Sequence, residues 1–211
     1  MSREHILHKV RTALGRTAGQ AVADPPTVRL RVSEMDVETR VAMMLQRVEA
    51  LAGKTRRVAT AQDARAYVGS VLGGKSAVAS NAPFLRECGI LDLAGVQSGF
   101  TAAPELRTLC ATADVGITSA DYALADTGTL VMLSSPQEAR LISLLPPVHI
   151  AVVPPQRVLT SLDELLIILP HPAEQTSSMV LITGPSRTAD IEQILVRGVH
   201  GPGEIHVVVV G

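Results

Sequence analysis

Apolar residues recur along this chain with two different periods, and the change between them falls near residue 55. Over 1–14 and again over 34–51 they return every three or four positions, which predicts two amphipathic helices, the second capped by Ser33. Farther along, short apolar runs alternate with helical stretches. The pattern predicts an N-terminal helical arm over 1–54 and an α/β domain over 55–211.

The α/β part is expected to alternate strands with helices. The expected strands are 57–61, a stretch within 110–118, 75–80, 129–133, 149–153, 179–183 and 204–210, and the expected helices are 62–72, 82–88, 162–169 and 188–195. Helices of this length between strands indicate βαβ units with right-handed crossovers and a mostly parallel sheet. Because the strands near Val115 and Thr129 almost adjoin, we expect one antiparallel pair and therefore a mixed sheet.

The composition supports a sheet covered by helices and excludes two classes of partner. Hydrophobic residues make up 46% of the chain but aromatic residues only 2%, so the core must be built from Ala, Val, Leu and Ile, as in buried parallel sheets. The formal net charge is −1, and no block of Lys or Arg occurs. We therefore expect neither nucleic acid nor a membrane surface as a partner, because both require clustered positive charge.

The number of cysteines limits the cofactors that this chain can bind, and the N-terminal sequence bears on its cellular location. Cys88 and Cys110 are the two cysteines of the chain, too few for the four thiolates of an iron–sulfur cluster, and no dinucleotide-binding fingerprint is present. We expect no bound cofactor and no metal site. The N-terminus is polar and lacks the apolar core of a signal peptide, and no apolar run is long enough to span a membrane. We expect a cytoplasmic protein.

A polar stretch at 116–130 is the first candidate site. It gathers carboxylates, hydroxyls and a glycine in a few positions, and these residues suit a polar ligand better than a core: Ser119, Asp121, Asp126, Thr127, Gly128 and Thr129. Gly128 between two threonines suggests a close backbone approach or a turn with positive φ. The alternative is a polar turn that leads into the strand 129–133.

Further candidates follow the other expected strands. Ligands of open α/β sheets bind beyond the carboxyl ends of the strands, so the polar residues after each strand are of interest. These are Ser80 and Asn81 after the first, Ser119 and Asp121 after the second, and Gly184, Ser186, Arg187 and Thr188 after a third. If the strands are parallel, these loops share one edge. We therefore expect the 116–130 loop and the 184–188 loop to face one cleft.

The 184–188 loop is the better candidate for binding an anion. The expected helix 188–195 would begin there with free backbone N–H groups, and Arg187 adds a fork of donors matched to carboxylate or phosphate. The alternative is that Arg187 pairs with a nearby carboxylate such as Asp190. His200, in a third polar turn, either acts as an acid or base near neutral pH or is an ordinary turn residue.

Two long segments carry a family resemblance. Residues 116–153 read GITSADYALADTGTLVMLSSPQEARLISLLPPVHIAVV, and residues 182–202 read ITGPSRTADIEQILVRGVHGP. Together they resemble the LUD-domain family of lactate utilisation proteins, in particular its C-type (LutC-like) members. The resemblance implies a three-layer α/β/α sandwich like that of the NagB, RpiA and CoA-transferase group. The family usually has Glu where Asp126 stands, which keeps the charge but shortens the side chain.

The resemblance also implies a function. It suggests a non-redox subunit of a system that oxidises L-lactate to pyruvate with iron–sulfur partner proteins, and that binds a small anion or a partner. The alternative is a stand-alone enzyme that acts on a sugar phosphate or an acyl-CoA, as the fold relatives do. Lactate-dependent dye reduction that requires added partner proteins would favour the first; turnover by the isolated chain would favour the second.

Overall fold

The computed structural model describes residues 2–21, 34–189 and 195–211, and the chain divides into two compact units, Met1–Leu30 and Arg31–Gly211. The first unit contains α1 (Arg3–Ala13), which begins where the Ser2 side chain accepts a hydrogen bond from the His5 N–H. Its apolar residues Ile6, Val10 and Leu14 are exposed. The expected helix over 1–14 is confirmed.

Helix α2 (Val37–Ala50) belongs to the second unit rather than to an arm. Its N-cap is Asp36, whose carboxylate accepts a hydrogen bond from the Thr39 N–H at 2.9 Å, while Ser33 lies outside the described residues. Val41, Met44 and Val48 are buried against the strands of the α/β unit. The expected boundary at residue 54 therefore moves to Leu30–Arg31, because the apolar face of α2 forms part of the core.

The centre of the second unit is a six-stranded sheet in the order β1-β12-β7-β4-β2-β3. Its strands are β1 (Lys54–Val58), β2 (Ala77–Ala79), β3 (Val96–Gln97), β4 (Val115–Ser119), β7 (Val148–Val153) and β12 (Glu204–Val210). Every pairing in this sheet is parallel. Both faces are buried, which explains the continuous apolar runs of β7 and β12.

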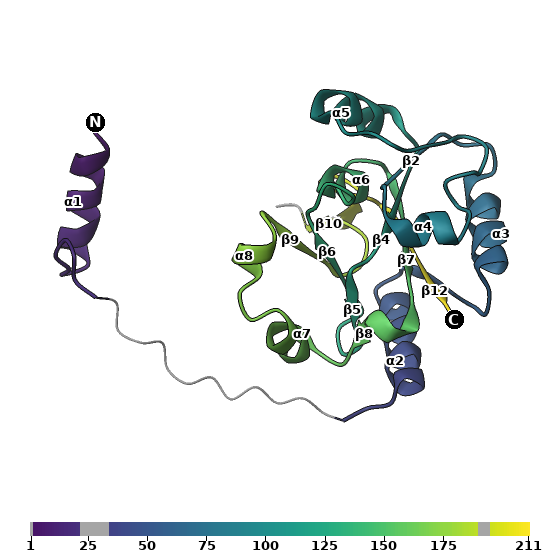
Figure 1. Ribbon diagram of the computed structural model, residues 1–211, viewed down its shortest axis with the longest axis horizontal. Coiled ribbons are helices and arrows are strands. Elements are labelled where there is room, and N and C mark those ends of the chain that lie inside the picture. Colours follow the sequence, from purple (N-terminus) through teal and green to yellow (C-terminus); the bar gives the residue numbers. More distant parts are fainter. Residues whose placement is uncertain (1, 22–33, 190–194) are drawn as a thin grey trace. The chain divides into compact units, whose positions relative to one another are not determined.

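Helices flank this sheet on both faces. Helices α3 (Ala61–Leu72) and α4 (Pro83–Glu87) pack on the face that carries Ile150 and Val208, and Figure 1 shows them together on one side of the sheet. The opposite face carries Ala151 and Val207 and packs against α2. Helices α5 (Ala103–Thr112) and α6 (Arg140–Leu144) pack beside Val78 on that same side.

A second, four-stranded sheet holds two antiparallel pairs, β5–β6 and β6–β9, and one parallel pair, β5–β8. Its order is β8-β5-β6-β9, with β5 (Tyr122–Leu124), β6 (Thr129–Leu133), β8 (Val158–Leu159) and β9 (Met179–Ile182). The expected mixed main sheet is therefore wrong. Strands β4 and β6 do not pair, because β5 lies between them in the chain and folds back onto β6 as a hairpin. The η1 turn (Pro155–Arg157), α7 (Leu162–Ile168) and α8 (Pro172–Gln175) complete the elements near this sheet.

The segment after β9 differs most from the expectation. A helix was expected over 188–195, but β10 (Arg187–Ala189) and β11 (Leu195–Arg197) are antiparallel strands with Thr188 opposite Val196. Residues 190–194 lie outside the described residues. β-Branched Thr188 and Val196 favour this pairing over a helix.

Most other expected elements are confirmed within a few residues, including β6, β7, β12, α3, α4 and α7. The sequence analysis missed α5, α6 and the short strands β3, β5 and β8. Among the described residues, no helix has the length and apolar character required to cross a membrane.

Candidate functional site

A cleft of about 520 Å³ lies at the carboxyl edge of the parallel sheet. Ser119 is the last residue of β4, Pro83 follows β2 and Pro154 follows β7, so the ends of three adjacent strands contribute to its wall. This is the edge at which open α/β sheets bind ligands, and the volume lies in the range of small-molecule sites. Its polar lining comprises Glu87, Ser119, Asp121, Ser135, Gln137, Glu138 and Arg157.

Asp121 is a partly buried carboxylate in the short loop between β4 and β5. Its Oδ2 accepts a hydrogen bond from the Leu133 N–H at 2.7 Å, which ties it to β6. Burial raises the pKa of Asp121, while the hydrogen bond from Leu133 and the charge of Arg157 oppose that shift. Arg157 donates from Nη1 to the Asp121 carbonyl at 3.1 Å and lies over the Tyr122 ring, 5.4 Å from its centroid. Arg157 is thereby held at the rim of the cleft.

Glu138 is the most perturbed acid in the cleft. Its side chain is only 5% exposed, and burial raises its pKa to about 8, with the charge of Asp121 adding to the effect. The Ser80 hydroxyl and the Ser119 backbone lower the pKa of Glu138, but their effect is smaller than that of burial. By strict hydrogen-bond geometry, and within the described part of the chain, neither the Glu138 carboxyl oxygens nor Ser80 Oγ has a partner. Glu138 is therefore a neutral carboxyl group near pH 7.

A tight turn places Glu138 in the cleft. The Glu138 N–H donates to Ser135 Oγ at 3.0 Å, and the Ser135 N–H donates to the Glu138 carbonyl at 3.0 Å. The Asn81 N–H donates to the Gln137 carbonyl at 2.8 Å, which fastens the turn to the end of β2. The sequence analysis did not identify Glu138, because a carboxylate after a Ser-Pro turn resembles an ordinary solvated residue; only its burial distinguishes it.

The structure brings two of the expected residues to the lining of this cleft. Ser119 and Asp121 line it, and Ser80 lies buried beside Glu138. Asn81 instead holds a neighbouring loop: its Nδ2 donates to the Phe100 carbonyl at 3.0 Å, and its Oδ1 accepts from the Gly99 N–H at 2.6 Å.

Four other expected residues form the turn between β5 and β6. The turn packs on α2: Gly128 has φ +68°, and a Cβ there would lie 2.8 Å from Arg47 Cβ. Hydroxyl contacts of 2.8 Å link Thr127 to Thr129, and Thr129 to Thr183. Neither these residues nor Asp126 line the cleft. The structure therefore places Asp126–Thr129 in the polar turn that was the alternative interpretation.

The 184–188 loop lines a different cleft, of about 410 Å³. Gly184, Ser186, Arg187 and His200 face it, whereas Thr188 lies in β10 and is not part of its lining. The expectation of one shared cleft is therefore wrong. The physical reason is that β9, which leads into this loop, belongs to the second sheet and not to the parallel one. The expected helix start at Thr188 is absent, and Arg187 donates from Nη2 to the Leu51 carbonyl at the end of α2.

Replacing Arg187 with alanine should lower stability modestly. The exposed guanidinium ties β10 to α2 through a single hydrogen bond, so its loss should cost about 1 kcal/mol. For a chain of this length, the thermal midpoint should fall by roughly 2–4 °C. Thermal unfolding and phosphate or carboxylate titration of the same variant separate structural and ligand roles: an unchanged midpoint with at least tenfold weaker anion binding would assign Arg187 to the ligand instead.

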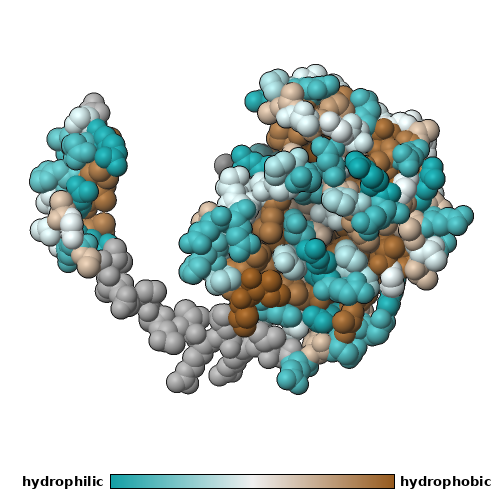
Figure 2. Space-filling model, in the orientation of Figure 1, coloured by the Kyte–Doolittle hydropathy of each residue, from teal (hydrophilic) through white to brown (hydrophobic). Residues whose placement is uncertain are grey.

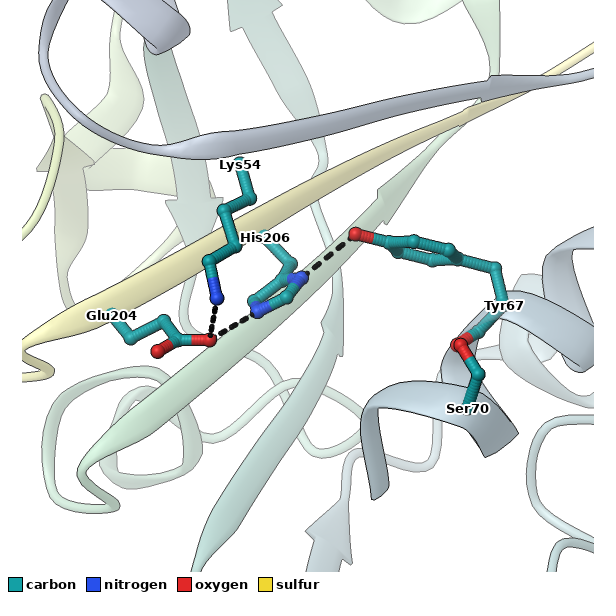
Figure 3. A network of polar contacts seen from close by, with 5 residues as sticks. All are labelled: Lys54, Tyr67, Ser70, Glu204 and His206. Atoms are coloured by element: carbon teal, nitrogen blue, oxygen red, sulfur yellow. Dashed lines mark hydrogen bonds and ion pairs between the residues drawn. The ribbon is translucent and has the colours of Figure 1, made fainter. Parts of the chain in front are cut away.

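A third polar cluster lies at the opposite, amino end of the sheet. Glu204 Oε1 contacts both Lys54 Nζ and His206 Nε2 at 2.6 Å, and the Tyr67 hydroxyl lies 2.8 Å from His206 Nδ1 (Figure 3). Burial lowers the pKa of His206, and the hydrogen bond and charge of Glu204 oppose the shift. Because each side chain has a partner, we interpret the cluster as a structural connection between β1, β12 and α3.

The described residues contain no group of three or more His, Cys, Asp or Glu suited to a metal ion. Cys88 and Cys110 are buried free thiols, and burial raises the pKa of both. Such thiols behave as small apolar core residues rather than as reactive groups.

The architecture and the cleft define a class: an α/β protein whose six-stranded parallel sheet, flanked by helices, carries a ligand-sized cleft at its carboxyl edge. The LUD domain family profile matches residues 41–210, and the chain belongs to this family. A solved structure, a DUF162 family protein from Deinococcus radiodurans, is similar with a TM-score of 0.63 over 84% of this chain and 100% of that chain, at 18% identity. That likeness concerns the fold.

Several curated relatives carry the name lactate utilization protein C. The protein from Halalkalibacterium halodurans is 44% identical over 94 residues, which cover 43% of this chain and 41% of that protein. The protein from Bacillus subtilis is 42% identical over 94 residues, covering 43% of this chain and 39% of that protein. The chain thus spans about two fifths of the length of the curated relatives that it matches.

Proposed function

We propose that this protein is a LutC-like subunit of an L-lactate utilisation system, which oxidises lactate to pyruvate together with iron–sulfur partner proteins. The similarity to proteins named lactate utilization protein C carries this proposal. We place its site in the cleft that contains Asp121 and Glu138. We further propose that the fold is a three-layer sandwich of the NagB, RpiA and CoA-transferase type. We also propose that the protein is located in the cytoplasm.

The small number of cysteines and the polar groups of the cleft support a non-redox role. Two cysteines cannot supply the four thiolates of a cluster, so electron transfer would be the task of the partner proteins. The cleft, in contrast, offers hydroxyl, carboxyl and guanidinium groups, which bind and orient a small polar acid. In this proposal the chain holds or delivers the substrate while its partners accept the electrons.

An apolar surface on α7 supports the presence of a partner. Leu162, Ile167 and Ile168 are 40%, 55% and 45% exposed, and Figure 2 shows apolar surface gathered over this helix. Neighbouring exposed aliphatic residues on one short helix are typical of protein interaction surfaces. We propose that this surface contacts a partner of the lactate-oxidising assembly.

Deletion of the gene tests the proposal most directly. We expect a deletion strain to grow normally on glucose but to lose growth on L-lactate, and plasmid-borne wild-type protein to restore it. Lactate-dependent dye reduction should require the chain together with its iron–sulfur partners. Normal lactate growth and dye reduction without the chain would refute the proposed function.

A second candidate, a stand-alone enzyme acting on a sugar phosphate or an acyl-CoA, is favoured by one observation. The cleft, at about 520 Å³, has the volume of sites for drug-sized ligands, which leaves space around a three-carbon acid. Turnover of phosphosugars or CoA esters by the isolated chain would establish this alternative.

A further inference from the structure

Strand β9 forms an uncharged edge of the second sheet. It is the last strand in the order β8-β5-β6-β9, and Figure 1 shows it beside its partner β6. From Thr176 to Ser186, which includes the whole strand, no residue carries a charge. Unpaired edges tend to pair with other chains, and proteins protect them with charged side chains, very short strands or burial. The β9 edge has no charged residue that would prevent such pairing.

The other edge strands of the two larger sheets carry this kind of protection. Strand β1, at one end of the six-stranded sheet, exposes Lys54, Arg56 and Arg57. Strand β3, at the other end, has two residues, and β8 has two residues that are both buried. The contrast among these described strands indicates that β9 is a surface for association with another chain.

The hydrogen bonds of neighbouring strands show which backbone groups of β9 point outward. In an antiparallel ladder, alternate residues of a strand bond to the partner strand. The Ser134 N–H donates to the Ser178 carbonyl at 2.9 Å, so every second residue counted from Ser178 bonds to β6. Val131, opposite Leu181, instead accepts a hydrogen bond from the Asp121 N–H at 3.0 Å on the β5 side. The N–H and carbonyl of Leu181 therefore face away from β6, and no described residue pairs with them.

Open space lies along the same strand. Consecutive residues from Val180 to Arg187 line the cleft of about 410 Å³, together with Leu144 at the end of α6. Leu181 is 43% exposed and Leu144 is 36% exposed. An added strand has room to approach β9 here, and its apolar side chains would cover both leucines.

The charges at the two ends of β9 favour a second copy of this chain as the added strand. Glu174 precedes the uncharged segment and Arg187 follows it, and both are exposed. Antiparallel pairing of two β9 strands places Glu174 of each copy toward Arg187 of the other, whereas parallel pairing brings like charges together. Arg187 donates to the Leu51 carbonyl from Nη2, and its other N–H groups are suited to a carboxylate. The edge is therefore complementary to itself in charge and in apolar character.

We propose that two copies of this chain associate by antiparallel pairing of their β9 strands about a two-fold axis at Leu181. Leu181 of each copy exchanges two hydrogen bonds with Leu181 of the other, and Met179 pairs with Thr183 on either side. The second sheets of the two copies become one continuous sheet. This inference is independent of the proposed function, because it rests on the strand edge and not on the cleft that contains Asp121 and Glu138.

Analytical ultracentrifugation of the full-length chain over a range of concentrations tests the dimer. Wild type should show a monomer–dimer equilibrium with a Kd on the order of 10 µM, because a four-residue edge buries little surface. Leu181→Pro removes an outward N–H, which edge strands tolerate, and thereby both central hydrogen bonds. It should weaken dimerisation at least about tenfold. Leu181→Lys places a charge on the same edge and should have a similar effect.

Reversal of the end charges tests the orientation of the two strands. Glu174→Lys faces Arg187 of the other copy with a like charge and should weaken the dimer by roughly three- to tenfold. Combining Glu174→Lys with Arg187→Glu exchanges the charges and should restore dimerisation. Amide hydrogen exchange gives a second measurement, since the Leu181 N–H should become protected as the protein concentration rises.

Two control variants alter exposed aliphatic residues elsewhere. Ile6→Lys in α1 and Ile167→Lys in α7 should leave the dimer unchanged, although both side chains are at least as exposed as Leu181. Thermal midpoints establish that each variant is folded. If Leu181→Pro does not fold, Leu181→Lys decides the result.

Several outcomes would overturn the β9 dimer. These are a wild-type chain that remains monomeric well above the expected Kd, and a dimer that persists in the folded Leu181 variants. Dissociation caused by Ile6→Lys or Ile167→Lys would assign the association to another surface. A dimer that the exchanged charges do not restore would contradict the antiparallel arrangement. Growth of the deletion strain on L-lactate tests the proposed function separately and does not bear on this dimer.

Discussion

Replacing Glu138 with glutamine is expected to raise the thermal midpoint, by an amount that grows with pH. The folded pKa of Glu138 is about 8, compared with 4.5 for an unperturbed glutamate. A carboxyl group with a raised folded pKa contributes fully to stability below pH 4.5, and that contribution is lost as the pH rises through 8. The difference of about 3.5 pKa units corresponds to roughly 4–5 kcal/mol above pH 8.

Glutamine has nearly the same shape but cannot ionise, so it avoids this loss. For a chain of this length the gain in midpoint should reach roughly 10 °C at pH 8 and should be small at pH 5. Thermal unfolding at pH 5, 7 and 8.5 provides the measurement, with Glu105→Gln as the exposed control. Parallel curves for wild type and Glu138→Gln would show that Glu138 ionises normally in the folded protein.

A second buried group, His149, affects how the stability of the protein depends on pH below neutrality. His149 is fully buried, with Nε2 2.8 Å from Thr118 Oγ1, and burial lowers its pKa to about 3. A histidine with a depressed folded pKa stabilises the fold above pH 6.5 and loses that contribution as the pH falls toward 3. Wild type and Glu138→Gln both contain His149, so both should lose the same stability at low pH. The difference between their thermal midpoints therefore reports the contribution of Glu138 alone.

A gain of stability at this position would also bear on function. A buried, unpaired acid destabilises a fold, and proteins retain such groups mainly where binding or catalysis requires them. Glu138→Gln should therefore combine higher stability with an altered pH profile of ligand binding. That combination distinguishes a functional carboxyl group from one with a structural role, whose replacement would destabilise the protein.

Replacing Gly116 with alanine is expected to destabilise the protein severely. Gly116 is the second residue of β4 and lies against α6, and a Cβ there would sit 1.9 Å from the Ile142 carbonyl oxygen and 3.1 Å from Pro146 Cγ. A backbone oxygen cannot rotate away as a side chain can, so α6 or β4 must shift. The cost should be at least about 3 kcal/mol, the upper part of the range for overpacked cores.

The same shift should affect the cleft. Strand β4 ends at Ser119, and α6 begins two residues after Glu138, so movement of either element displaces one wall of the site. Urea unfolding with wild-type and Gly116→Ala protein measures the loss of stability. Gly69→Ala in α3 is the matched control: its Cβ would meet only Leu93 Cδ2 at 3.5 Å, and alanine favours a helix. Equal stability of both variants would contradict the close approach of α6.

Local sequence pattern predicted the elements whose neighbours agree with their intrinsic preference. Strands β6, β7 and β12 are runs of aliphatic, often β-branched residues, and such runs form strands in many packing environments. Ser119 and Asp121 were correctly placed at a strand end, because the boundary between an apolar run and a polar loop is visible in the sequence. The family resemblance supplied the proposed function, which no local pattern contains.

Tertiary structure alone decided what depends on distant contacts. The segment around Arg187 has a helix-like pattern, yet Thr188 pairs with Val196 as a strand. The sequence does not specify that β9 joins the second sheet, which separates the Arg187 loop from Asp121. Glu138 resembles a solvated turn residue until Ser80, Ser119 and Asp121 surround it. The spacing of apolar residues indicates which secondary structure the backbone prefers. The burial and the charge environment of a side chain are set only when segments distant in the sequence pack together.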